Sequence, residues 1–233
     1  MILSGHKIRQ KLKQGAITID PPPIQITDEN TNELGRINPA SVDLTLGNEV
    51  AVYEAFTVCS VADEWDLLRE KKLTAAQGFG EGPYDGRGLQ ANHMVGGINR
   101  SNFLDTRKPA KLRKWSIDPV VGWCLMPGVG YLMHTVERVT TDHYVPVLDG
   151  KSSIGRIFVQ VHVTAGFGDP GYDGQYTLEV TSKFPVIVYP GMRFCQMRFH
   201  CIDGEVLNYR DTGHYQGEQA KGAVASRINE TGF

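Results

Sequence analysis

The chain has 233 residues, enough to bury a full hydrophobic core, so one domain with decorations is the default expectation. Its composition is that of an ordinary globular protein, and its net charge of −2 gives no support to nucleic-acid or membrane-surface binding. No apolar run approaches the ~20 residues of a membrane helix, and we recognise no secretory leader. We therefore expect a cytoplasmic protein with four reduced cysteines, no nucleic-acid partner and no membrane contact.

The N-terminal part predicts a short helix followed by a strand. Ser4 can cap the helix and Gly15 can end it. In residues 41–46 apolar residues alternate with polar ones, and Asp43 lies on the polar side, which is the spacing of a strand.

Residues 61–114 have a different character and predict an insertion into the domain. Residues 61–72 could form a helix, and residues 78–88 are rich in glycine. No phosphate-loop signature is present, because no Gly-Lys-Ser/Thr follows the glycines. A flexible insertion is the favoured interpretation, and a lid or a subunit-contact arm is the alternative.

From Trp123 onward the pattern predicts one short strand after another, separated by Gly, Pro and Asp turns. Short strands without intervening helices indicate an all-β sandwich or barrel. The polar tail, residues 209–233, is expected to fold over another surface. The predicted strands are 130–134, 137–140, 144–148, 157–163, 176–180, 185–189 and 194–199.

A lone carboxylate, Glu179, interrupts one of these apolar strands. Alternation puts Tyr176, Leu178 and Val180 on one face, and Thr177 and Glu179 on the other. Glu179 is either a solvent-facing residue of a half-exposed strand or a general base.

A compact cluster of cations and hydroxyls, Lys151, Ser152, Ser153 and Arg156, follows an Asp-Gly turn. Hydroxyls, turn amides and a guanidinium are the groups that bind a phosphate chain. The alternative is a capped turn that leads into a short helix.

Six motifs in order along the chain resemble the dCTP deaminase family, within the dUTP pyrophosphatase superfamily. They are spread in order across nearly the whole chain apart from the insertion before Trp115. They are SVDLTLG (41–47), LMPGVGYLMHTVERVT (125–140), LDGKSSIGR (148–156), VHVTAGFGDPGYDGQYTLE (161–179), YPGM (189–192) and GAVASRI (222–228).

The resemblance implies a single domain over residues 1–233, an all-β, jelly-roll-like distorted barrel of the dUTPase-like kind with a short N-terminal helix. It implies a homotrimer with active sites at subunit interfaces, conversion of dCTP to dUTP and ammonia, and Mg²⁺ carried on the nucleotide phosphates. The family uses no zinc. Zinc deaminases need H-x-E and P-C-x-x-C, and the nearest approach here is His134-Thr-Val-Glu137, with the wrong spacing and no cysteine pair.

Carried over residue by residue, the resemblance makes Glu179 the general acid–base that activates water for attack on C4. Ser152 and Arg156 would hold the water and orient Glu179. Lys151, Ser153 and the surrounding turn would contact phosphate.

The remaining substrate contacts implied by the resemblance lie in the following loop, the strand and the tail. Asp169 would accept the sugar 3′-hydroxyl. Ala165 belongs to an Ala-Gly start that is similar to members that also hydrolyse dUTP to dUMP, and Asp169 would be catalytic in that step. The other implied contacts are Thr177, Leu178, Tyr209, His214 and Glu218. Tyr209 and the tail would close over base and phosphates from a neighbouring subunit.

The tail departs from the family pattern at two phosphate donors. A lysine is replaced by His214, and a glutamine aligns with Glu218, which would repel a triphosphate. Either the register shifts, so that Gln216, Gln219 or Lys221 becomes the donor, or the substrate carries fewer phosphates, as in dCMP.

Several functions therefore stay open at the level of the sequence. They are deamination with or without dUTP hydrolysis, dUTP pyrophosphatase activity alone, action on a modified cytosine nucleotide, and a non-catalytic nucleotide-sensing module. Feedback by dTTP is an expectation from the family.

Overall fold

The computed structural model describes residues 1–23, 35–53, 104, 106–215 and 217–231. The expected helix at 61–72 and most of the insertion lie outside these residues. The chain divides into two compact units. The first comprises residues 1–51 and 116–224, and the second comprises residues 52–115 and 225–233. All of the predicted site residues belong to the first unit.

The first unit begins with helix α1 (Gly5–Lys13), which the sequence predicted correctly. The side chain of Ser4 accepts a hydrogen bond from the amide of Lys7 at 3.4 Å, which satisfies one free amide of the first turn. Ile8 is fully buried and attaches the helix to the core.

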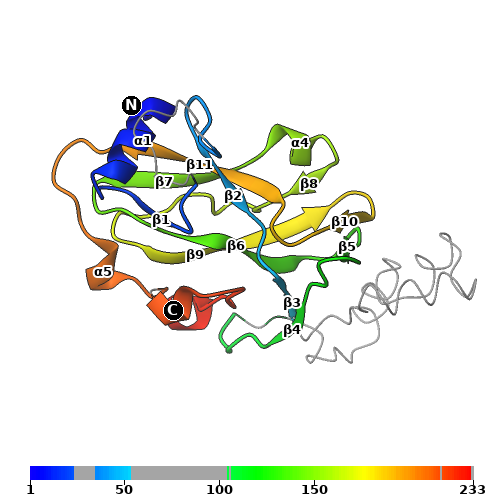
Figure 1. The fold of residues 1–233 in the computed structure, drawn as a ribbon. Helices are drawn as coiled ribbons and strands as arrows, with labels where there is room; N and C mark the ends of the chain where they lie inside the picture. The colour runs from blue at the N-terminus through cyan, green and yellow to red at the C-terminus, as the bar shows by residue number, and fades with distance from the viewer. Residues whose placement is uncertain (24–34, 54–103, 105, 216, 232–233) are drawn as a thin grey trace, which may run out of the picture. The chain divides into compact units, whose positions relative to one another are not determined.

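Two layers of strands form the body of this unit (Figure 1). In one layer β2 and β7 flank β11. In the other, β6 lies between β3 and β9, β8 follows β9, and β1 also pairs with β6. A small third sheet joins β5 and β10. The bounds are β1 (Thr18–Asp20), β2 (Val42–Thr45), β3 (Glu49–Tyr53), β5 (Trp123–Leu125), β6 (Tyr131–Thr140), β7 (Tyr144–Gly150), β8 (Val159–Gln160), β9 (Asp173–Ser182), β10 (Val186–Val188) and β11 (Arg193–Cys201).

The core lies between the two layers and is built from alternate strand positions. Val42, Leu44, Leu178 and Val180 are 0% exposed, as the alternation read from β2 and β9 predicts. Asp43, on the other face of β2, is buried as well, so that face does not meet solvent as its polar residue suggested. The chain was predicted to be all-β, and the described part is mostly β with a few short helices. The expected barrel is not found, because the described strands form three separate sheets and do not close.

Two strand predictions were wrong in detail. Residues 130–134 and 137–140 form one strand, β6, whose pairing with β9 shifts register between His134 and Arg138. Of the expected strand at 157–163, only Val159–Gln160 pairs. Phe158 has a φ of 58°, a left-handed conformation that breaks an extended run before it can continue.

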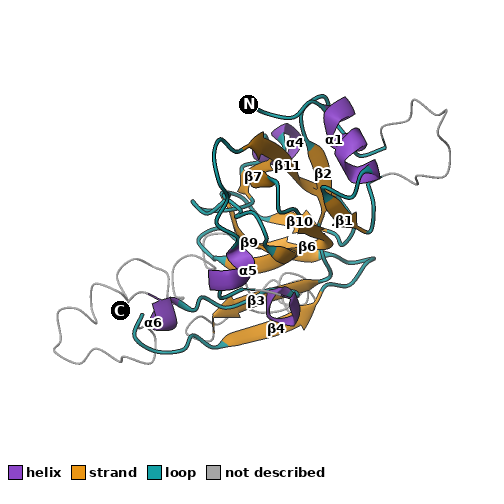
Figure 2. Cartoon of the chain, turned by 90° about the vertical axis from the view of Figure 1, so that its left-hand side faces the viewer, coloured by secondary structure: helices purple, strands orange, loops and turns teal. Residues whose placement is uncertain are grey.

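Short helical turns complete the first unit, and the tail carries two of them. They are α4 (Ser152–Gly155), α5 (Tyr209–Thr212) and the 3₁₀ turn η2 (Gly217–Ala220). Figure 2 shows α4 and α5 as single turns among the strands. The second unit contains the end of β3, most of β4 (Leu112–Ser116) and α6 (Ile228–Thr231). No described helix is long and apolar enough to cross a membrane.

Candidate active site

The serine-bearing turn follows directly from the end of β7. Lys151 is extended, and the chain then forms the single turn α4, in which the amide of Arg156 donates to the carbonyl of Ser152 at 3.0 Å. Ile154 is buried, whereas Ser152, Ser153 and Arg156 are exposed. Ser152 and Arg156 are four residues apart in this turn and therefore lie on the same side of it. The capped turn leading into a short helix is thus present, and it displays the predicted cluster at the surface.

The side chains of Ser152, Ser153 and Arg156 are available to bind a ligand. Within the described part of the chain, none of them makes a hydrogen bond or ion pair. Lys151 differs from them, because its ammonium pairs with the buried carboxylate of Asp43 at 2.6 Å.

Glu179 lies in β9 opposite Leu132 of β6, and its neighbours Leu178 and Val180 point into the core. The carboxylate is half-buried, and its Oε2 accepts a hydrogen bond from the amide of Val163 at 3.2 Å. Among the described residues its Oε1 has no partner. The strand therefore presents a carboxylate that is partly shielded, oriented by one amide, and still able to accept a proton.

The loop that orients Glu179 runs back along β7. The amide of Leu148 donates to the carbonyl of Gly166 at 2.6 Å, and the amide of Gly168 donates to that of Pro146 at 2.8 Å. A Cβ at Gly166 would lie 2.5 Å from the Leu148 carbonyl oxygen, so this close approach requires glycine. The loop leaves the side chains of Ala165 and Asp169 exposed.

The tail reaches this loop at Tyr209, whose amide donates to the carbonyl of Pro170 at 2.8 Å. The Tyr209 ring meets that of Tyr172 edge-on, with 5.9 Å between centroids. Tyr209 therefore lies beside the Asp169-Pro170-Gly171 turn of its own chain. His214 is exposed, and the side chain of Glu218 lies outside the described part.

Further along, the tail docks on the same face of β9 that carries Glu179. The hydroxyl of Thr177 accepts from the amide of Val224 at 3.3 Å and donates to the carbonyl of Gly222 at 3.4 Å. Gln175 Oε1 accepts from the amide of Gly222 at 2.8 Å. The tail thus docks on a strand of its own chain. Thr177 holds the tail, and Leu178, fully buried, can offer a substrate only its backbone.

A pocket of about 270 Å³ lies where the tail meets the start of β9. Arg138, Gln175 and Lys221 are among its lining residues, and Asp20 adds a negative charge. Gln175 precedes Glu179 by four residues, or about 13 Å of strand. This pocket is therefore separate from the surroundings of Glu179.

Glu137, the glutamate of the HTVE segment, has a structural place. It is 0% exposed, pairs with Arg36, and accepts from the amide and hydroxyl of Thr45 at 2.8 Å each. Sequence reasoning did not predict this role, nor that of Asp43. The sequence signal that could have indicated these buried roles is that Glu137 and Asp43 each lie between apolar positions of a strand. Among the described residues no three His, Cys, Asp or Glu side chains gather as a metal site.

The described fold is mostly β. It displays the hydroxyls and guanidinium of the α4 turn at the surface and a half-buried carboxylate, Glu179, on β9. A family model described as dCTP deaminase-like matches residues 75–202. The chain is 33% identical over 216 residues to "dCTP deaminase, dUMP-forming" of Hathewaya histolytica, covering 93% of this chain and 91% of that protein. The chain belongs to the dCTP deaminase-like family, which confirms the resemblance read from the motifs.

Two further likenesses agree with this membership. "dCTP deaminase, dUMP-forming" of Cytophaga hutchinsonii is 35% identical over 216 residues, covering 93% of this chain and 91% of that protein. The crystal structure of 2′-deoxycytidine 5′-triphosphate deaminase from Agrobacterium tumefaciens aligns with a TM-score of 0.50 and 18% identity. That alignment covers 90% of this chain and 50% of the Agrobacterium chain, and it bears on the fold alone.

Proposed function

We propose that this chain deaminates dCTP and then hydrolyses the resulting dUTP to dUMP and pyrophosphate. The observation that carries the proposal is Glu179, a half-buried carboxylate held by the Val163 amide with one oxygen unengaged among the described residues. Relatives that share most of the length of this chain are named dCTP deaminase, dUMP-forming. The balanced overall reaction consumes dCTP and two waters and releases ammonia, pyrophosphate and dUMP.

In the deamination step Glu179 takes a proton from water as the oxygen attacks C4 of cytosine. The same carboxyl passes that proton to N3, then takes the second proton from the hydroxyl formed on C4 and gives it to the departing amine, so that ammonia leaves and the carbonyl of uracil forms. General acid–base catalysis of this kind contributes about 10²–10⁴-fold to the rate.

Ser152, Ser153 and Arg156 bind phosphate and the attacking water in this proposal, and they act on a neighbouring subunit's Glu179 in a homotrimer. Two observations support this arrangement. The three side chains are exposed and, within the described chain, uncommitted. The chain that follows the turn also carries exposed apolar side chains, as an interface requires: Ile157 42%, Phe158 55%, Val163 62%, Phe167 67% and Phe184 51%.

Asp169 serves both steps in this proposal. Its carboxylate is exposed, next to Pro170 whose carbonyl accepts from the Tyr209 amide, and in this proposal it accepts the sugar 3′-hydroxyl. In the second step it activates the water that attacks the α-phosphate. Mg²⁺ enters as part of the substrate, bound to the triphosphate, and no protein side chain is assigned to it.

The tail favours one alternative, a preference for dCMP. His214 replaces a family lysine and Glu218 a family glutamine, and both changes weaken binding of a γ-phosphate. Lys221 lines a pocket with Arg138, at the far end of β9 from Glu179.

Separate incubations of the purified protein with dCTP, dCMP and dUTP in the presence of Mg²⁺ test these proposals. We expect ammonia from dCTP and pyrophosphate from both dCTP and dUTP. Ammonia from dCMP in preference to dCTP would select the alternative. Pyrophosphate from dUTP with no product from dCTP would show a dUTP pyrophosphatase only, and nucleotide binding without any product would show a sensor.

A further inference from the structure

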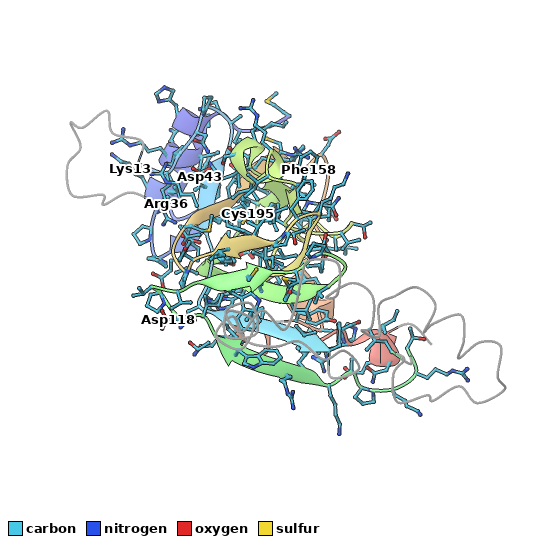
Figure 3. The ribbon with its side chains drawn as sticks, turned by 90° about the vertical axis from the view of Figure 1, so that its right-hand side faces the viewer. Lys13, Arg36, Asp43, Asp118, Phe158 and Cys195 are labelled. Carbon is cyan, nitrogen blue, oxygen red and sulfur yellow. The ribbon has the colours of Figure 1, made fainter. Side chains whose placement is uncertain are left out.

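Phe158 is the only non-glycine residue of the described chain that has a positive φ, which is 58°. It lies two residues after Arg156, at the end of the serine-bearing turn (Figure 3). The Cβ of an L-residue makes a left-handed backbone unfavourable, so this conformation persists only where surrounding contacts hold it. The side chain of Phe158 is 55% exposed, so the core does not supply all of these contacts. Groups at the surface must supply the rest.

Two residues just beyond β9 hold Phe158. The ring of Phe184 meets the ring of Phe158 edge-on, with 5.5 Å between centroids and 87° between planes, a geometry that aromatic pairs prefer. The ammonium of Lys183 lies 5.5 Å from the centroid of the Phe158 ring, within the range of a cation–π contact. The amide of Lys183 also donates to the carbonyl of Phe158 at 3.0 Å. Both the ring and the backbone of Phe158 are thus attached to the segment that follows β9.

The same residue closes the serine-bearing turn. The amide of Phe158 donates to the carbonyl of Gly155 at 3.0 Å. β8 begins at the next residue and pairs with the end of β9, the strand that carries Glu179. Residue 158 is therefore the point at which the turn is joined to β9. If its backbone left the left-handed region, the chain would leave the turn in another direction, and Arg156 would be displaced relative to β9.

We propose that the ring pair of Phe158 and Phe184 holds the strained backbone at residue 158 and thereby positions Arg156. Both phenylalanines are then positioning residues. The inference rests on the proposed function, in which Arg156 acts beside a neighbouring subunit's Glu179. It leaves unchanged the phosphate contact expected of Lys151.

The strain at residue 158 is measured by comparing Phe158→Ala with Phe158→Gly. Both changes remove the ring, but only alanine keeps the Cβ that opposes a left-handed backbone. Phe158→Gly should therefore unfold about 2–8 °C above Phe158→Ala when thermal unfolding is followed by circular dichroism. In a regular strand or helix glycine is the less stable of the two, so equal or reversed Tm values would overturn the proposal.

A rescue by glycine tests whether the ring pair acts through the backbone. Phe184→Ala removes the pair and leaves the strain, so kcat for ammonia release should fall, by up to about 100-fold for a displacement near 1 Å. In a Phe158→Gly background no strain remains, and adding Phe184→Ala should change the rate by less than about twofold. If the rings contributed only apolar contact area, the double variant would be no faster than Phe184→Ala alone. That result would overturn the proposal.

Amide hydrogen exchange gives a readout that does not depend on catalysis. The amides of Arg156 and residue 158 close the turn, and both should exchange faster in Phe184→Ala than in the wild type. Adding Phe158→Gly should return the Arg156 amide toward the wild-type rate. Unchanged exchange in Phe184→Ala would refute the positioning role. A wild type that releases no ammonia from any cytosine nucleotide would refute the proposed function, and this measurement would still decide the role of the ring pair.

Tyr144→Ala is the matched control. It removes one ring of an edge-on pair with His143, with 6.5 Å between centroids, at the other end of β7 from the turn. Exchange at the turn and kcat should stay within about twofold of wild type. An equal loss in Tyr144→Ala would show a general loss of stability and would contradict a specific role for the ring pair.

The state of assembly is measured beside each assay, because Phe158 and Phe184 also belong to the exposed apolar surface offered to a neighbouring subunit. Sedimentation velocity should show the wild-type assembly for Phe184→Ala and for the double variant. A Phe184→Ala variant that dissociates, and that regains its rate at higher protein concentration, would assign the ring to the subunit interface and overturn the proposal.

Discussion

Two glutamates, Glu137 and Glu179, differ so strongly in environment that substitution should separate stability from activity. Glu137 is 0% exposed and pairs with Arg36, which is itself 17% exposed. Its carboxylate also accepts both the amide and the hydroxyl of Thr45 at 2.8 Å. The change Glu137→Gln keeps the shape and hydrogen-bonding oxygen but removes the charge that faces the guanidinium.

The expected cost follows from these contacts. Removing one partner of a buried ion pair costs about 3–5 kcal/mol, because the other charge stays buried. Arg36 retains the carbonyls of Pro21 and Pro22 at 3.4 and 3.3 Å, so the lower end, about 3 kcal/mol, applies. At about 2–4 °C per kcal/mol for a chain of this size, Tm should fall by about 6–12 °C.

Thermal unfolding followed by circular dichroism measures this change, and ammonia release from dCTP at about 20 °C below the variant's Tm serves as the activity control. We expect a lowered Tm with activity within about threefold of wild type, since the pair lies away from the reacting groups. A Tm within about 2 °C of wild type would refute the reasoning from burial and charge. Loss of activity at an unchanged Tm would show instead that Glu137 takes part in the reaction.

Three smaller predictions follow from single contacts. Thr177→Val removes two hydrogen bonds to the tail, which together stabilise the docked tail by about 1 kcal/mol. Tryptic cleavage at Lys221 should therefore become about fivefold faster. An unchanged cleavage rate would contradict the docking of the tail. Gly47→Ala places a Cβ 2.1 Å from the buried ring of His134. The free energy of unfolding measured with denaturant should fall by about 1–3 kcal/mol. An unchanged unfolding midpoint would show that the ring moves aside without cost. Burial raises the pKa of the Cys195 thiol, so thiol labelling of the native protein should modify exposed Cys201 and spare Cys195 until unfolding; equal labelling would contradict this burial.

Local patterns were enough to predict much of the fold. The capping serine of α1 and the alternation in β2 and β9 specify those elements within a few residues, because helix caps and strand faces are local properties. The run at 157–163 misled the prediction for a physical reason. Its apolar side chains are typical of a buried strand, but Ile157, Phe158 and Val163 are exposed to solvent in the structure.

The sequence was enough to select the residues of the candidate site but not the long-range side-chain pairs that hold them in place. The resemblance to the family implied the roles of Ser152, Arg156 and Glu179, and alternation indicated the face of Glu179. The partner of Lys151 lies 108 positions earlier in the chain, and that of Glu137 lies 101 positions earlier. No local pattern carries such pairings, because they arise only when β2 packs beside β11 and across from β6.

The most direct test of the central claim is ammonia release from dCTP by Glu179→Gln, measured beside nucleotide affinity. The amide keeps the shape of the side chain but cannot take a proton from water. Deamination should fall by at least about 100-fold while binding of dCTP and Tm stay near wild type. Undiminished ammonia release would show that Glu179 is not the proton-transfer group and would contradict the account.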